Sequence, residues 1–291
     1  MGGLLQSAHW PFLIDVYFFL GGLAGGAFVI STAALIVDSV RYRDVSRVGY
    51  YLALVALVPC PVILIVDLGV PVRFMNMVMT FNPRSPMSMG AWALLGFSSA
   101  AFLAALLTLL EDLGKARNMS RPKTVIGVVG GFLGFFLAAY PGVLLGATAR
   151  PLWINAHTLG ALFLAVGASS GAAAMALVLA ALSRRSGDGI ARLATTTVLA
   201  VVIQLVAMIG FVWSVRASGS APALNALALI TSGPYSMLFW GGAIVAGSVL
   251  PILLGLVGLM RPSVGLTAVT SVLVLVGGFL VKTLIMAAGQ V

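Results

Sequence analysis

The sequence has little charge, little histidine and almost no cysteine. Among its 291 residues, 8% are charged, two are histidines and one, Cys60, is a cysteine. A single cysteine excludes an intrachain disulfide, a cysteine-ligated iron–sulfur cluster and a covalently attached haem. His9 and His157 are unsuited to holding a haem between them, because His9 precedes the first apolar segment. We therefore expect neither haem nor a metal in this chain.

Apolar residues are abundant instead: they make up 61% of the chain, and the mean hydropathy is +1.13. Roughly 20 apolar residues cross a bilayer as a helix, which satisfies its own backbone hydrogen bonds. The sequence therefore predicts an all-α polytopic membrane protein with eight transmembrane helices. We expect these helices at about 12–37, 48–68, 88–110, 124–147, 153–182, 192–214, 233–259 and 263–287.

The net charge of +9 raises the possibility of nucleic-acid binding. However, the basic residues lie in short clusters between the apolar segments, which is typical of loops beside anionic lipid headgroups. We expect membrane lipid as a partner and no nucleic acid. Most lysines and arginines follow the first, third, fifth and seventh segments: Arg41, Arg43, Arg47, Lys115, Arg117, Arg121, Lys123, Arg184, Arg185, Arg192 and Arg261.

These clusters also predict the orientation, because basic loops stay in the cytoplasm. We expect a multi-pass protein of a prokaryotic cytoplasmic membrane with both termini outside. Lys282 lies within the last apolar segment, and we expect its amine to extend to the headgroups. The remaining basic residues lie on the outer side: Arg73, Arg84, Arg150 and Arg216.

The outer loop between the second and third segments is interrupted by prolines too often to cross the membrane. Its residues 72–81 contain methionines and phenylalanines with few charges, which predicts an interfacial amphipathic helix. Flexible methionines favour packing against another surface. The alternative is a helix that lies in the headgroups without a partner. We expect a partner protein to dock at Arg73, Asn76, Phe81 and Arg84.

A weak internal repeat accompanies this pattern. The spacing of phenylalanine and glycines in Phe18–Ala27 recurs in Phe163–Ala172, and Pro86–Trp92 recurs as Pro234–Trp240. Because each copy holds four apolar segments, the two copies have the same orientation in the membrane. The sequence therefore predicts a single membrane domain of two parallel four-helix units that pack through glycines, at about 1–147 and 148–291.

Proton-exchanging side chains gather at one level, near the outer ends of the predicted helices. They are Asp15, Tyr17, Asp67, Tyr140 and His157, with His9 at the interface or beyond it. An ionisable group inside a membrane marks a functional site by default. The pattern favours proton-coupled chemistry on a lipid-soluble molecule such as a quinone, which needs an apolar slot, donors for two carbonyls and a path to water.

Each candidate also has a structural explanation. Asp15 and Asp67 could cap helix ends or pair with an arginine, Tyr17 could belong to an interfacial aromatic belt, and His157 could be a packing residue. Tyr140 precedes Pro141-Gly142, a kink that opens the backbone and favours a site. Two other functions stay open: a transporter or channel, which normally places polar groups at the midplane, and a purely structural anchor.

Several motifs in one order complete the pattern. They are Phe19–Ala27, Asp67–Phe74, Phe81–Ser88 followed by Gly90–Trp92, and Tyr140–Leu145 followed by Arg150–Trp153. With them the chain resembles, over essentially its whole length, the NrfD/PsrC family of membrane subunits from polysulfide-reductase-type respiratory complexes. The resemblance implies an eight-helix, haem-free anchor that binds menaquinone or ubiquinone. It also implies a ferredoxin-like subunit with four iron–sulfur clusters on the extracytoplasmic face, commonly joined to a molybdopterin catalytic subunit.

The resemblance further implies a quinone headgroup near the iron–sulfur subunit, among polar residues of the first helix and a tyrosine of the fourth. Tyr140 matches that tyrosine. On the first helix the resemblance places histidine and asparagine where this chain has Tyr17 and Ile14. We therefore expect a subunit that exchanges electrons and protons with the quinone pool but is not catalytic alone. Its expected quinone ligands are Tyr17, Tyr140, Asp15, His9 and His157, and its expected proton relay is Asp15, Asp67 and His157.

Overall fold

The structure is a computed structural model that describes residues 10–67, 74–115, 119–182, 188–261 and 263–291. His9 and Arg73 therefore lie outside the described residues. Within them, eight helical spans are long and apolar enough to cross a membrane, which confirms the predicted all-α membrane fold. The spans are α1 (Phe12–Val37), α2 with α3 (Arg43–Leu57 and Pro59–Asp67), α5 (Pro86–Asp112), α6 (Ser120–Gly146), α8 (Leu159–Leu182), α9 (Asp188–Ala217), η2 with α11 (Leu238–Val249 and Leu250–Met260) and α12 (Val264–Gly289).

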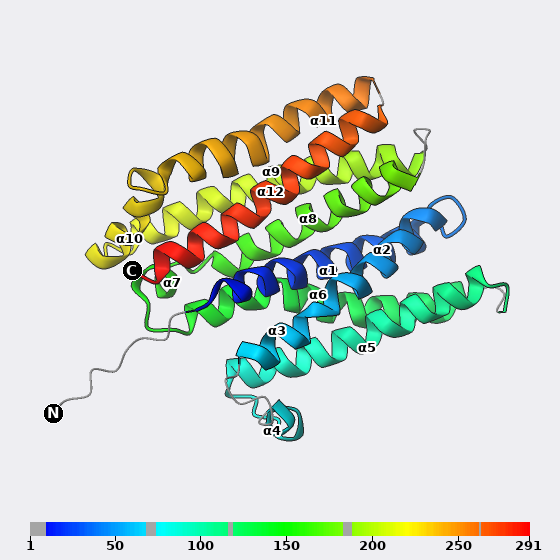
Figure 1. The fold of residues 1–291 in the computed structure, drawn as a ribbon, viewed down its shortest axis with the longest axis horizontal. Helices are drawn as coiled ribbons and strands as arrows, with labels where there is room; N and C mark the ends of the chain where they lie inside the picture. Colours follow the sequence, from blue (N-terminus) through cyan, green and yellow to red (C-terminus); the bar gives the residue numbers. More distant parts are fainter. Residues whose placement is uncertain (1–9, 68–73, 116–118, 183–187, 262) are drawn as a thin grey trace.

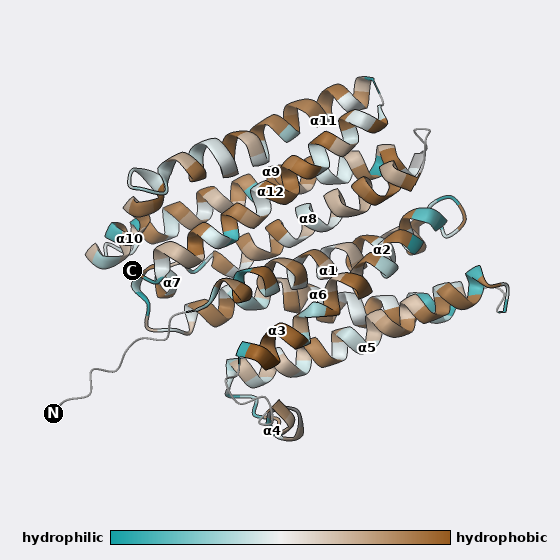
Figure 2. Cartoon of the chain, viewed as in Figure 1, coloured by the Kyte–Doolittle hydropathy of each residue, from teal (hydrophilic) through white to brown (hydrophobic). Residues whose placement is uncertain are grey.

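Two of the spans are irregular. The second is divided between Leu57 and Pro59, because proline lacks the amide that a continuing helix needs. The first part of the seventh span, η2, is a π-helix, which has more residues per turn than an α-helix. The α-helix α11 follows it directly. Figure 2 shows hydrophobic residues along the lengths of the spans and hydrophilic residues gathered toward their ends.

The two ends of the bundle differ in character. Both described termini lie at one end, together with the short helices α4 (Phe74–Met79), α7 (Pro151–Ile154) and α10 (Ala221–Thr231) (Figure 1). We call this end the termini end. The C-terminal ends of α1, α5, α8 and α11 lie at the opposite end, which we call the basic end. The helix α4 falls within the predicted interfacial segment 72–81, whereas α10 was not predicted.

The helix α1 lies at the centre of the bundle and packs against α2, α6 and α8. Glycines make these approaches close. A Cβ atom on Gly26 would overlap the backbone of Gly167 in α8, and one on Gly25 would overlap the Gly134 carbonyl in α6. Small residues at helix crossings let backbones meet without a hydrophobic drive between helices. The contact between α1 and α8 joins the two halves of the predicted repeat, whose division into two four-helix units stays a prediction.

Candidate functional site

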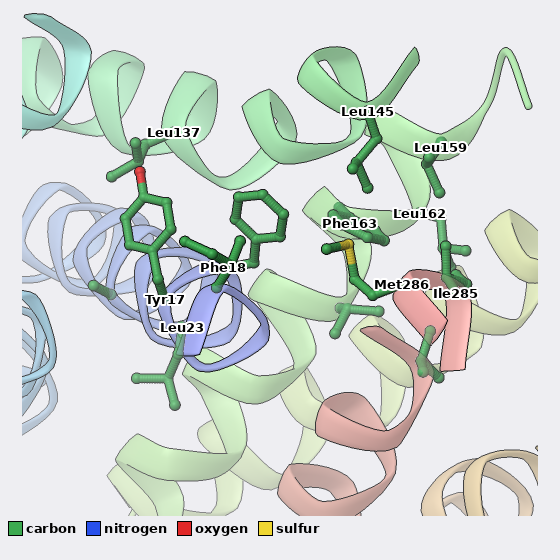
Figure 3. Close-up of a cluster of buried hydrophobic side chains, with 14 of the residues drawn as sticks. Tyr17, Phe18, Leu23, Leu137, Leu145, Leu159, Leu162, Phe163, Ile285 and Met286 are labelled. Carbon is green, nitrogen blue, oxygen red and sulfur yellow. The ribbon is translucent and has the colours of Figure 1, made fainter. Parts of the chain in front are cut away.

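Two buried tyrosines lie near each other toward the termini end. Tyr17 of α1 is 4% exposed and Tyr140 of α6 is 5% exposed. Tyr17 lies within electrostatic range of Tyr140 and of Cys60 in α3. No hydrogen bond from either hydroxyl is present among the described residues. In Figure 3 the Tyr17 hydroxyl points toward Leu137 of α6. We call Tyr17 and Tyr140 the tyrosine pair.

The sequence around Tyr140 explains how its ring is held. The ring stacks on Phe136, with centroids 5.9 Å apart, and lies against Gly90 of α5, where a Cβ atom would overlap it. Pro141 has no amide hydrogen, so it leaves the Leu137 carbonyl without its usual helical donor. Tyr140 therefore places a phenol between α5 and α6, while Gly142 packs against Gly160 of α8.

Asp15 does not join the tyrosine pair. Residues two apart in an α-helix project about 200° apart, so Asp15 and Tyr17 point to opposite sides of α1. Asp15 shares the side of Gly22, seven residues further on, which faces α8 and α12. Asp15 is 6% exposed, and its Oδ1 has no hydrogen-bond partner in the described part of the chain. The spacing in the sequence was sufficient to predict this separation.

The expectation for Lys282 was wrong. Its side chain is fully buried, and its Nζ donates a 2.6 Å hydrogen bond to the Phe18 carbonyl instead of extending to the headgroups. Nζ also lies 5.1 Å from the centre of the Phe163 ring. Gly22 makes this possible, because a Cβ atom there would come within 2.7 Å of Nζ. A carbonyl and an aromatic face thus replace the water that an amine loses on burial.

Two substitutions of Lys282 are expected to separate the energetic effect of burying an amine from the effect of filling the space. Lys282→Met keeps the volume and removes the buried amine, while the Phe18 carbonyl keeps its helical partner. We expect its thermal stability to equal or exceed that of the wild type. Lys282→Ala leaves a cavity that costs about 2–5 kcal/mol. Thermal unfolding of the purified variants measures both, and a methionine variant less stable than the alanine variant would contradict this account.

The other predicted residues are more exposed than the tyrosine pair. Asp67 is exposed at the end of α3, and His157 is exposed between α7 and α8. His157 lines a cavity between α6 and α8, whereas Tyr140 faces α5 from α6. At the loop by α4, Asn76, Phe81 and Arg84 are exposed, and Phe81 makes an edge contact with Trp92, 5.7 Å between centroids.

A further set of charged groups gathers at the basic end. Arg47 pairs with Asp112 at 2.7 Å, and Lys123 pairs with Glu111. Tyr51 donates a 2.7 Å hydrogen bond to Asp112. These pairs line an open cavity of about 470 Å³. Because each carboxylate already has a cation, this cluster closes the basic ends of α2, α5 and α6 rather than forming a second proton-exchanging layer.

Deep in the second half, one polar cluster is satisfied within itself. Ser169 of α8 donates to the Gln204 side-chain oxygen at 2.5 Å, and Gln204 of α9 donates to Ser248 of η2 at 3.5 Å. Ser248 in turn donates to the Ala243 carbonyl at 2.9 Å. Among the residues that the structure places, no group of three or more histidine, cysteine or acidic side chains could hold a metal ion.

The fold and these side chains define a polytopic α-helical membrane protein with a buried pair of phenols toward one end of the bundle. The chain belongs to the NrfD family: the family model described as "Polysulphide reductase, NrfD" matches residues 3–291. This confirms the resemblance drawn from the motifs.

Three curated relatives are similar over different lengths. The polysulfide reductase C chain of Wolinella succinogenes is 26% identical over 306 residues, which cover 97% of this chain and 94% of the relative. A protein NrfD homolog of Haemophilus influenzae has the same identity and the same coverage. The selenate reductase C subunit of Mesobacillus selenatarsenatis is 25% identical over 88 residues, 30% of this chain and 21% of that protein. The names of the first and third describe subunits of reductases.

Proposed function

We propose that this chain is the quinone-reactive membrane subunit of a reductase complex. It would exchange electrons and protons between the membrane quinone pool and an iron–sulfur subunit on the extracytoplasmic side. The observation that carries the proposal is the tyrosine pair, two buried phenols without an internal hydrogen-bond partner among the described residues. The names of two relatives, which describe parts of a polysulfide reductase and of a selenate reductase, support a place in such a complex.

The tyrosine pair fits a quinone headgroup chemically. A quinone has two carbonyl oxygens that accept hydrogen bonds, and phenols are donors that stay neutral at physiological pH. Menaquinone or ubiquinone would supply the two-electron, two-proton chemistry, which this chain's own side chains lack. The part of Tyr17 and Tyr140 is to orient the headgroup and donate to its oxygens. The surrounding rings of Phe18 and Phe136 exclude water.

Protons need a route from the tyrosine pair to water. The helix α3 offers one connection, since Cys60 lies near Tyr17 and Asp67 is exposed at the far end of the same helix. We propose Asp67 as the acceptor on this side. Asp15 lies on the opposite side of α1, which faces α8 and α12. We propose that it relays protons there, together with His157 at the surface. Protons would then exchange at the termini end alone.

The partner is proposed to dock at the termini end. The excess of lysine and arginine at the other end supports an orientation with the termini end outside the cytoplasm. There α4 and the exposed side chains of Asn76, Phe81 and Arg84 offer apolar and basic contacts, and Arg73 belongs to the same loop. A ferredoxin-like subunit with four clusters, joined to a molybdopterin catalytic subunit, would bring its electrons close to the tyrosine pair.

The transporter alternative has less support. A transported solute needs polar groups at the midplane that are free to bind it. The polar cluster of Ser169, Gln204 and Ser248 already satisfies its members with one another and with the backbone. A purely structural anchor would not need two buried tyrosines whose side chains make no hydrogen bond among the described residues.

Quinone content tests the proposed function directly. The protein, purified with its partner subunits under mild conditions, is expected to contain close to one or more quinones per copy of this chain. Solvent extraction and chromatography measure the amount. A preparation that is active toward an artificial electron carrier, yet holds no quinone and binds none on titration, would contradict the proposal.

A further inference from the structure

A cleft runs along the seam between α6 and α8, apart from the tyrosine pair. Its outer part, of about 510 Å³, is lined from Ala156 and His157 inward. Its inner part, of about 440 Å³, extends to Ala168 of α8 and reaches Gly25 and Gly26 of α1. Phe135, Ala161 and Leu164 line both parts, so the two adjoin. We call them together the seam cleft.

The length of the seam cleft matches one leaflet. The helix α8 rises about 14 Å from Leu159, its first residue, to Ala168. This is close to half of the roughly 30 Å hydrocarbon core. The cleft therefore extends from one membrane surface to about the middle of the bilayer. Its walls are mainly glycine and alanine, which leaves room for a hydrocarbon tail between the helices.

Polarity is confined to the outer end of the cleft. His157 is exposed there, and its imidazole has no hydrogen-bond partner among the described residues. The Trp153 indole, also in the outer part, already donates to the Ile285 carbonyl at 3.0 Å. Every residue that lines the inner part is apolar. The site thus suits an amphiphile with a small polar head at His157 and an apolar tail directed inward.

The lack of charged side chains in the lining of the cleft favours an uncharged headgroup. No lysine, arginine or carboxylate is found among the described residues that line either part. Nearby Arg150 donates to the Gln290 carbonyl at 2.9 Å. A phospholipid phosphate would lack a cation there, whereas a quinone carbonyl needs only one donor. The tyrosine pair is separate, because neither Tyr17 nor Tyr140 lines the cleft and Tyr140 faces α5.

We propose that the seam cleft is a second quinone site, in which His157 donates to a headgroup carbonyl and the prenyl tail occupies the inner part. The inference rests on the proposed function, since it takes its ligand from the same quinone pool. Ala161 is the position at which the proposal can be tested. It is exposed, and a larger side chain there would divide the outer part from the inner part.

Native mass spectrometry of the full-length protein, titrated with a long-tailed menaquinone and with tail-less menadione, tests the proposal. The wild type is expected to hold two long-tailed quinones, and Ala161→Leu one. His157→Ala is expected to weaken the second site about five-fold to ten-fold, the loss of one hydrogen bond. The control Ala191→Leu, exposed on α9 outside the cleft, is expected to hold two. The tail-less probe should bind the second site at least ten-fold more weakly.

The outcomes separate the two proposals. If Ala161→Leu still holds two quinones, or if the molecule that it displaces has the mass of a phospholipid, the seam cleft is not a quinone site. If the tyrosine variants lose one quinone while the cleft variants lose none, the cleft proposal fails and the proposed function stands. If only one quinone binds and the cleft variants lose it, the assignment of a quinone to the tyrosine pair is wrong. A wild type that binds none overturns both.

Discussion

Tyr140→Phe is expected to lower quinone-linked turnover of the assembled complex by about 10-fold to 100-fold, because it removes one of two donors to the quinone carbonyls. The phenylalanine ring keeps the stacking on Phe136 and the contact with Gly90. Since the hydroxyl has no partner among the described residues, its removal is expected to leave thermal stability unchanged. A lower rate would therefore report on the site and not on unfolding.

The controls for Tyr140→Phe follow from the same structure. Turnover with an artificial electron carrier that bypasses the membrane subunit is expected to stay at the wild-type level. Tyr235→Phe changes a half-buried tyrosine between α10 and η2, away from the tyrosine pair, and is expected to keep full quinone-linked turnover. Equal rates for Tyr140→Phe and the wild type would show that Tyr140 is not a ligand.

Gly26→Ala is expected to be one of the most damaging small substitutions among the described residues. Its Cβ atom would overlap the Gly167 backbone, which cannot move aside as a flexible side chain can. Overpacking of this kind costs about 1–3 kcal/mol or more. It acts where α1 meets α8, so we expect much less folded protein in the membrane. Fluorescence-detected size-exclusion chromatography of tagged protein measures the folded fraction.

The molecule offers a matched control for this substitution. A Cβ atom on Gly241 of η2 has no neighbour within 4 Å, so Gly241→Ala is expected to be neutral. Gly167→Ala, on the other side of the same contact, is expected to resemble Gly26→Ala. The double variant should cost less than the two single variants added together, because one separation of the helices accommodates both. Wild-type amounts of folded Gly26→Ala would contradict the glycine packing described here.

The helical framework was accessible from the sequence because the membrane imposes a simple pattern. Long apolar segments with basic residues between them predict spans, and the spans fall where hydropathy places them. The helix α10 was not predicted, because Gly219 lies just before it and Pro222 lies in its first turn. Its 11 residues are also too few to cross a membrane. Its first turn accommodates the proline, which needs no donor there.

The candidate site could be predicted from the sequence only in part. Depth along each helix predicts residues that lie toward the same end of the bundle, but depth says nothing about direction around a helix. The two-residue spacing of Asp15 and Tyr17 already implied opposite sides of α1. The burial of Lys282 could not be inferred in this way, because it depends on Gly22 of a helix 260 positions away in the sequence. The inner part of the seam cleft likewise arises from residues of four separate helices.

The central claim is that the tyrosine pair binds a quinone headgroup, and quinone titration of Tyr17→Phe/Tyr140→Phe tests it most directly. The purified full-length protein is titrated with menaquinone and the bound quinones are counted, with Tyr235→Phe as the control. We predict that the double variant stays folded, loses one bound quinone and keeps the quinone assigned to the seam cleft. Wild-type stoichiometry and affinity in the double variant would contradict the claim.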